Sequence, residues 1–207
     1  MSCRTLKETA VAITAAAFVV SLLAGAAASE TLFTSSGQAL TEGAGGAALA
    51  KLYVAAPLDV LERQDGAAHV AVKGWARAGA ERALFALPGK WILLAAVDRN
   101  SVSRLREIGE WTDPETSVMW KQLELDGWVD STMTVTSVEP IWDKAWELFS
   151  TRCTVCHVRR VPEHYTANQW ASHLKVMGPR TGLPEESQSL ILTFLQYHAS
   201  DTTGTNP

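Results

Sequence analysis

The stretch Cys153-Thr154-Val155-Cys156-His157 is the most informative part of this chain of 207 residues. Two cysteines stand three positions apart, and a histidine follows the second one directly. This spacing is typical of c-type haem attachment, because both thiols reach vinyl groups of the porphyrin and form thioethers while the imidazole reaches the iron. The motif therefore predicts one covalent haem c, bound through Cys153, Cys156 and His157.

A helix is predicted on each side of this motif. Pro140 suits the first turn of a helix, and apolar residues at helical spacing run from Ile141 to Phe149, just before the motif. A second helix is expected over residues 185–198, with Pro184 and two acidic residues at its start. These features predict an all-α haem domain over residues 138–201. Residues 202–207 contain no apolar side chain and are expected to form a loose tail.

Other uses of a close cysteine pair fit the sequence less well. A redox-active disulfide belongs in an α/β thioredoxin-like pattern, and none is visible around the motif. A zinc site needs two more ligands at suitable spacing. Cys3 is the third cysteine and lies in the N-terminal segment, so no disulfide framework is expected.

The sixth ligand of the iron is open between several side chains. Met177 follows His157 by 20 residues and precedes Gly178-Pro179, a turn from which a thioether can reach the iron. His164 and His173 are alternatives, as is an open site. A methionine ligand raises the reduction potential, whereas a second histidine lowers it.

Two aromatic residues between the motif and Met177 are expected to wall the haem pocket. They are Tyr165 and Trp170. Ordinary core packing explains two buried rings equally well.

The N-terminus has the pattern of an export signal. Arg4 and Lys7 precede an apolar run over residues 9–23, and small residues over 25–29 supply a cleavage site after Ala28 or Ser29. We therefore expect residues 1–29 to be a signal peptide, the protein to be periplasmic, and no membrane span to remain after cleavage. Without cleavage the apolar run would serve as a membrane anchor.

The segment between the signal and the haem domain has the pattern of short strands. Apolar and polar residues alternate over 58–62 and 68–73, and residues 91–97 form a continuous apolar run. Turn residues separate these runs, which predicts a small antiparallel β-barrel over residues 49–137. Residues 30–48 are rich in Ser, Gly and Thr and are expected to be a flexible lead-in. The fold class expected for the whole chain is α+β.

Composition narrows the class of function. With 47% hydrophobic and 19% charged residues the chain is globular, and a net charge of −4 argues against a nucleic-acid partner. A single haem without evident acid–base groups favours an electron-transfer protein over an enzyme, because an enzyme would need an open iron site and such groups beside it. A haem-based redox or gas sensor, acting as a regulatory subunit, is the alternative.

Several stretches resemble the final mono-haem region of TorC-type c-type cytochromes, which serve trimethylamine N-oxide and dimethyl sulfoxide respiration. The stretches before the motif, together with Gly127-Trp128-Val129, also resemble bacterial SH3-like barrels. The resemblance thus implies an SH3-like barrel followed by a class I-like mono-haem cytochrome c domain. The stretches that carry it are Lys51-Leu-Tyr-Val-Ala-Ala-Pro-Leu-Asp-Val-Leu61, Val72-Lys-Gly-Trp75, Gly89-Lys-Trp-Ile-Leu93, the haem motif, Pro162-Glu-His-Tyr-Thr-Ala-Asn-Gln-Trp170, Met177 and Leu195-Gln-Tyr-His-Ala-Ser-Asp201.

The same resemblance implies redox partners in anaerobic respiration. These are a membrane-bound multihaem cytochrome that oxidises quinol and a molybdenum reductase for S-oxides or N-oxides. The family carries four further haems upstream, whereas this sequence has one Cys-x-x-Cys-His motif. We therefore expect a soluble shuttle or docking subunit that does not itself oxidise quinol.

Overall fold

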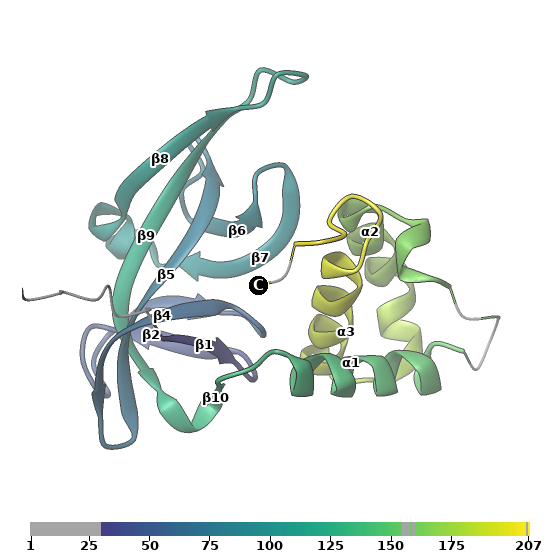
Figure 1. The fold of residues 1–207 in the computed structure, drawn as a ribbon, viewed down its shortest axis with the longest axis horizontal. Helices are drawn as coiled ribbons and strands as arrows, with labels where there is room; N and C mark the ends of the chain where they lie inside the picture. Colours follow the sequence, from purple (N-terminus) through teal and green to yellow (C-terminus); the bar gives the residue numbers. More distant parts are fainter. Residues whose placement is uncertain (1–29, 155–157, 159, 206) are drawn as a thin grey trace, which may run out of the picture.

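In the computed structural model, which describes residues 30–154, 158, 160–205 and 207, a β-sheet unit is followed by three helices (Figure 1). This arrangement confirms the predicted α+β class. The strands are β1 (Thr31–Thr34), β2 (Gln38–Thr41), β3 (Ala48–Leu52), β4 (Pro57–Gln64), β5 (Ala67–Arg77), β6 (Ala83–Leu87), β7 (Lys90–Val97), β8 (Arg106–Thr112), β9 (Met119–Asp130) and β10 (Thr134–Val135), and the helices are α1 (Glu139–Arg152), α2 (Ala167–Met177) and α3 (Glu185–Tyr197).

The strands form one antiparallel sheet that curls back on itself. Their order is β10-β1-β4-β5-β6-β7-β3-β2-β9-β8, and β5 also pairs with β9. The β5–β9 pairing is the longest, running from Ala67↔Asp130 to Arg77↔Trp120. Because β9 bonds both β2 and β5, the sheet is partly ring-like and encloses a core of buried leucine, valine and alanine side chains.

Residues 30–48 are not the flexible lead-in that their composition predicted. They contain β1 and β2, and Leu32 and Leu40 are buried in the sheet core. Thr34 is also buried, and its hydroxyl donates to the carbonyl oxygen of Tyr53 at 2.5 Å. The prediction was wrong because it weighed the Ser, Gly and Thr content, whereas two short alternating strands needed only a few inward side chains.

The helical part contains one helix more than the sequence pattern predicted. The two expected helices are present as α1, with a proline in its first turn, and α3. Between them lies α2, which starts with a capping box: the Thr166 hydroxyl accepts from the backbone N–H of Gln169, and the Gln169 side chain accepts from the backbone N–H of Thr166. The Thr-x-x-Gln spacing is the sequence signal for this helix start.

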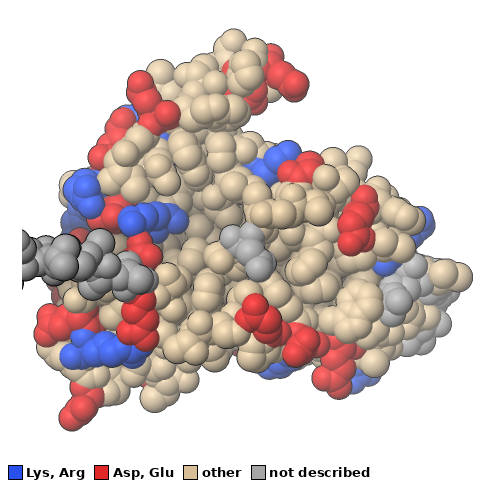
Figure 2. Space-filling model, viewed as in Figure 1, with Lys and Arg blue, Asp and Glu red and all other residues tan. Residues whose placement is uncertain are grey.

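The sheet unit and the helices share a hydrophobic core. Val54, Ala55 and Ile92 of the sheet unit are buried among side chains of the three helices, including Ile191 and Leu195. Acidic and basic side chains are interspersed over the sheet unit on the visible face (Figure 2). The sheet unit and the helices therefore pack against each other through this common core.

The C-terminal end is anchored more firmly than expected. The Thr202 side chain is buried, and its hydroxyl donates to the Gln196 carbonyl oxygen at 2.6 Å. The prediction of a loose tail is therefore wrong at Thr202, because a hydroxyl can be buried when a backbone carbonyl accepts its hydrogen. None of the helices within the described residues is long and apolar enough to cross a membrane.

Candidate functional site

Cys153 lies at the C-terminal end of α1. Its backbone N–H donates to the Phe149 carbonyl oxygen at 3.2 Å, which continues the helical hydrogen bonding into the motif. The side chain is half-buried, and burial raises the pKa of the Cys153 thiol. The other predicted attachment residues, Cys156 and His157, lie outside the described residues, as does the expected signal segment 1–29.

Cys153 borders an apolar hollow between α1 and α2. The hollow brings Cys153 together with Tyr165, Trp170 and Met177, which the sequence had singled out, and also with His173. His164 does not line it; this residue is exposed in the short 3-10 turn Pro162–His164. The remaining lining residues are Phe149, Arg160, Leu174 and Thr181.

Aromatic rings form one wall of this hollow. The Tyr165 ring lies edge-on to the ring of Trp170, with 4.9 Å between the centroids, and to that of His173 at 4.4 Å. Trp170 is 3% exposed, and its indole Nε1 donates to the Pro162 carbonyl oxygen at 2.8 Å. This hydrogen bond ties the wall to the turn that leads back toward the motif.

Two side chains that can bind iron border the hollow from α2. His173 and Met177 are four residues apart, which places them on the same face of the helix. Both are exposed, Met177 to 46%. Sequence reasoning named both as candidates, and the structure brings both, but not His164, to the same hollow as Cys153.

The donor set and the walls suit a covalently attached haem. A thiol for a thioether bond, an imidazole and a thioether sulfur for the iron, and apolar aromatic walls for the porphyrin face are the groups such a cofactor uses. Arg160, whose guanidinium lies 5.8 Å from the Tyr165 ring centroid, adds a cation at the rim. The residues described at this hollow therefore fit haem c.

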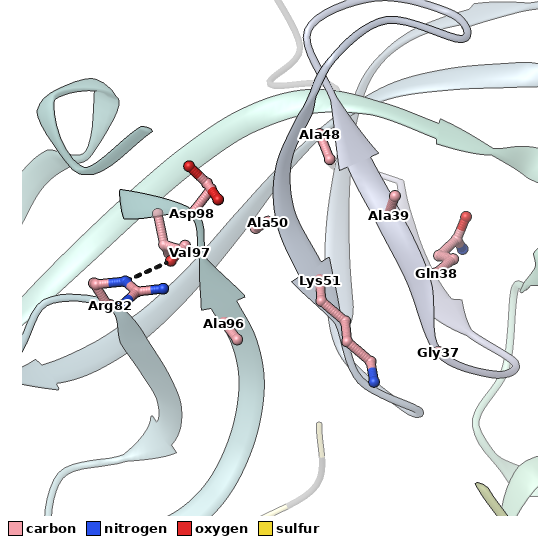
Figure 3. Close-up of a pocket in the computed structure, with 10 residues that line it drawn as sticks. All are labelled: Gly37, Gln38, Ala39, Ala48, Ala50, Lys51, Arg82, Ala96, Val97 and Asp98. Carbon is pink, nitrogen blue, oxygen red and sulfur yellow. Dashed lines mark hydrogen bonds between the residues drawn. The ribbon is translucent and has the colours of Figure 1, made fainter. Parts of the chain in front are cut away.

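A second groove lies on the sheet unit and has different chemistry. It has a volume of about 470 Å³ and runs over β2, β3 and β7, where alanines form much of its lining (Figure 3). Its charged groups are Lys51, Arg82 and Asp98, and the Arg82 Nε donates to the Val97 carbonyl oxygen at 3.1 Å. It offers no thiol, thioether or imidazole, so it is not a second place for a haem.

Comparison with known proteins identifies relatives of most of this chain. The chain is 30% identical over 154 residues to the cytochrome c-type protein TorC of Escherichia coli K12, which covers 74% of this chain and 40% of the relative. It is 31% identical over 134 residues to the cytochrome c-type protein TorY of Escherichia coli O157:H7, covering 65% of this chain and 36% of the relative. The chain thus spans about two fifths of the length of the curated relatives that it matches. No solved structure matches it significantly.

A protein-family model matches the part of the sequence that forms the sheet unit. The TorC third cytochrome c domain matches residues 26–133, a range that includes β1 to β9 and holds no cysteine. The Cys-x-x-Cys-His motif and the hollow at α1 and α2 follow this range along the chain. The model covers more than half of the sequence, and the predicted resemblance to TorC-type cytochromes is confirmed. The chain belongs to the TorC third cytochrome c domain family and is related to the TorC and TorY c-type cytochromes.

Proposed function

We propose that this protein is a periplasmic electron carrier with one covalent haem c. Cys153 and Cys156 would form the thioethers, and His157 would be the proximal ligand of the iron. The observation that carries the proposal is that Cys153 shares one apolar hollow with His173 and Met177, in a chain related to c-type cytochromes. When bound, the haem supplies a one-electron couple between ferrous and ferric iron.

The chain's own residues would hold this group and set its properties. Tyr165 and Trp170 would pack against the porphyrin and exclude water, which affects the reduction potential. Met177 is the distal ligand that we favour, with His173 as the alternative that borders the same hollow. Arg160 at the rim has the charge to pair with a haem propionate.

The relatives and the N-terminal sequence support a proposal for the cellular setting. Residues 1–29 would direct export, with cleavage after Ala28 or Ser29, so that the protein acts in the periplasm. Its partners would be redox proteins, with a membrane multihaem cytochrome as electron donor and a molybdenum reductase for S-oxides or N-oxides as acceptor. The partly ring-like sheet would serve as an SH3-like docking domain. Similarity to TorC and TorY supports these assignments.

Covalent attachment is the direct test of the proposed function. The full chain, produced together with a c-type haem maturation system, should carry one haem per chain that survives denaturing electrophoresis and haem staining. The double variant Cys153→Ser/Cys156→Ser should lose this covalent haem, while the variant Ser150→Ala, which changes a side chain on the helix before the motif and keeps both thiols, should retain it. A wild-type chain that matures without covalent haem would contradict the proposal.

Distal ligation by Met177 has its own signature. The ferric protein should show the weak long-wavelength charge-transfer band of methionine-ligated iron, and Met177→Ala should abolish that band while covalent haem remains. His173→Ala and His164→Ala are the matched controls and should retain it. If Met177→Ala leaves the band unchanged, Met177 is not the ligand; and if the ferrous wild type binds carbon monoxide readily, the open iron would favour the sensor function instead.

A further inference from the structure

The turn between β6 and β7 is bound by a side chain of the first turn of α2. Asn168 accepts the backbone N–H of Trp91 at its Oδ1 (2.8 Å) and donates from its Nδ2 to the Gly89 carbonyl oxygen (2.9 Å). One amide side chain thus satisfies a backbone donor and a backbone acceptor of the turn, which fixes its orientation. This is a two-point contact between the sheet unit and α2.

Two further polar side chains complete the contact. Gln196 of α3 is 2% exposed, and its Nε2 donates to the carbonyl oxygens of Trp91 (3.0 Å) and Ala167 (3.2 Å). The Asp201 carboxylate accepts the backbone N–H of Ala167 (2.8 Å) and the Lys90 Nζ (2.5 Å). Both polar groups of the Trp91 backbone are therefore held by side chains of the helical part. We call Asn168, Gln196 and Asp201 the interface triad.

The apolar side of the same contact includes a residue in a strained conformation. Ala55 is fully buried in the core shared with the helices and has a φ of 61°, in the left-handed region that favours glycine. The backbone N–H of Ala55 donates to the Thr34 carbonyl oxygen at 2.8 Å. Strain of this kind persists only where the surroundings hold it, so the contact is specifically packed and not an incidental touch.

The interface triad acts on the helix that borders the haem hollow. Ala167 and Asn168 are the first two residues of α2, and His173 and Met177 lie further along the same helix. An α-helix of this length transmits the position of its first turn to the rest of its residues, because its backbone hydrogen bonds make it stiff. The same helix carries Trp170, the centre of the aromatic wall.

We infer that Asn168, Gln196 and Asp201 are positioning residues, through which the β6–β7 turn of the sheet unit holds α2 and so sets the distal side of the iron. The inference rests on the proposed haem function. It makes the sheet unit a structural component of the haem site, beyond any docking role. A loosened contact should let α2 shift and change both the strength of distal ligation and the reduction potential.

The test compares Asn168→Ala with Asn100→Ala in the full-length haem-bound protein. Asn100 is an exposed asparagine in the short 3-10 helix after β7 and is the matched control. Both variants should retain covalent haem. Asn168→Ala should shift the midpoint potential and weaken the long-wavelength charge-transfer band of the ferric iron. It should also accelerate hydrogen exchange of the α2 amides about five- to thirtyfold, as expected for the loss of one or two hydrogen bonds.

Two further comparisons keep the inference falsifiable. Lys90→Met removes the ion pair to Asp201 and leaves Asn168 in place, and it should shift the same observables in the same direction even if Asn168→Ala fails to fold. The inference is overturned if hydrogen exchange of the α2 amides accelerates in Asn168→Ala while its midpoint potential and charge-transfer band match those of Asn100→Ala. The interface triad would then stabilise the fold without acting on the iron. Absence of covalent haem from the wild type is a separate result, because it would contradict the proposed function before any variant is compared.

Discussion

Trp170 joins the aromatic wall of the hollow to the core of the helical part. Its ring contacts the rings of Phe149 and Tyr165 with centroid distances of 6.2 and 4.9 Å. Its indole N–H donates to the Pro162 carbonyl oxygen, in a place where both groups are buried. Tryptophan suits this position because it combines a large apolar surface with one hydrogen-bond donor.

Replacement of Trp170 by phenylalanine should therefore destabilise the protein. The variant keeps an aromatic ring but removes the indole hydrogen bond, so that the Pro162 carbonyl oxygen keeps only the backbone N–H of Tyr165, at 3.4 Å. The net loss of one such hydrogen bond costs about 0.5–1.5 kcal/mol. Urea unfolding followed by circular dichroism measures the difference. Trp91→Phe is the control: that side chain is 59% exposed, so the change should stay within about 0.5 kcal/mol. Equal stability of the two variants would show that the indole hydrogen bond is unimportant.

At the scale of elements, β9 is the strand that closes the sheet. It pairs with β5 and β8 along most of its length and with β2 at Thr41↔Trp128. Gly127 lies where β2 approaches most closely. A Cβ atom there would be 2.8 Å from both the Cγ of Leu40 and the carbonyl oxygen of Thr41. Glycine is required here for close approach of two backbones and not for an unusual φ.

A methyl group at position 127 should push β2 away from β9. Gly127→Ala is expected to lower the free energy of unfolding by about 1–3 kcal/mol, because the backbone of β2 must move away. Gly109→Ala in β8 is the matched control, since the nearest atom to its Cβ would be the Oε1 of Gln122, at 3.2 Å, at the end of a flexible side chain. Its effect should be within about 0.5 kcal/mol. Denaturant midpoints that fall equally in both variants would contradict the role assigned to Gly127.

At the scale of the whole molecule, one ion pair connects the sheet unit to the end of α3. Lys90 begins β7 and Asp201 follows α3, and their side chains are 30% and 22% exposed. Burial raises the pKa of Asp201, but hydrogen bonds from Lys90 and from the Ala167 backbone N–H outweigh it and lower the pKa below its ordinary value of 3.8. The folded structure therefore favours the charged carboxylate.

This shift predicts how the contact responds to pH. A carboxylate whose pKa is lowered by folding stabilises the protein fully above its unfolded-state pKa of about 3.9, and the contribution disappears as pH falls through the lower folded value. The stability difference between wild type and Asp201→Asn should therefore shrink as pH decreases from about 6 to about 2. Urea unfolding at several pH values measures it, with Asp143→Asn, an exposed carboxylate on α1, as the charge-matched control. A difference that stays constant over this range would refute the prediction.

Local patterns account for what could be predicted of the fold. The helices α1 and α3 have apolar residues at helical spacing, and this pattern can be recognised within the sequence of each helix alone. The short helix α2 was missed as an element, although its Thr166-x-x-Gln169 capping box is visible in the sequence. β1 and β2 were missed because strands of four residues leave too few alternating positions to stand out from a Ser- and Gly-rich background.

Some residues of the candidate site could be predicted from the sequence, and others could not. The cysteine motif and the nearby residues Tyr165, Trp170 and Met177 could be named because they lie within 25 residues of one another in the sequence. The interface triad could not be named as such. Asn168 meets Gly89 across 79 positions and Gln196 meets Trp91 across 105, and no local pattern links residues so far apart.

The sequence by itself determined the Cys-x-x-Cys-His motif, the candidate iron ligands and the two helices α1 and α3, all of which depend on short-range spacing. Only the tertiary structure decided which candidates meet. It brought Met177 and His173, but not His164, to the hollow beside Cys153. It also joined the sheet unit to α2 through Asn168. The physical reason is that hydrogen bonds and packing between distant segments form only after the chain has closed large loops, so no local pattern records them.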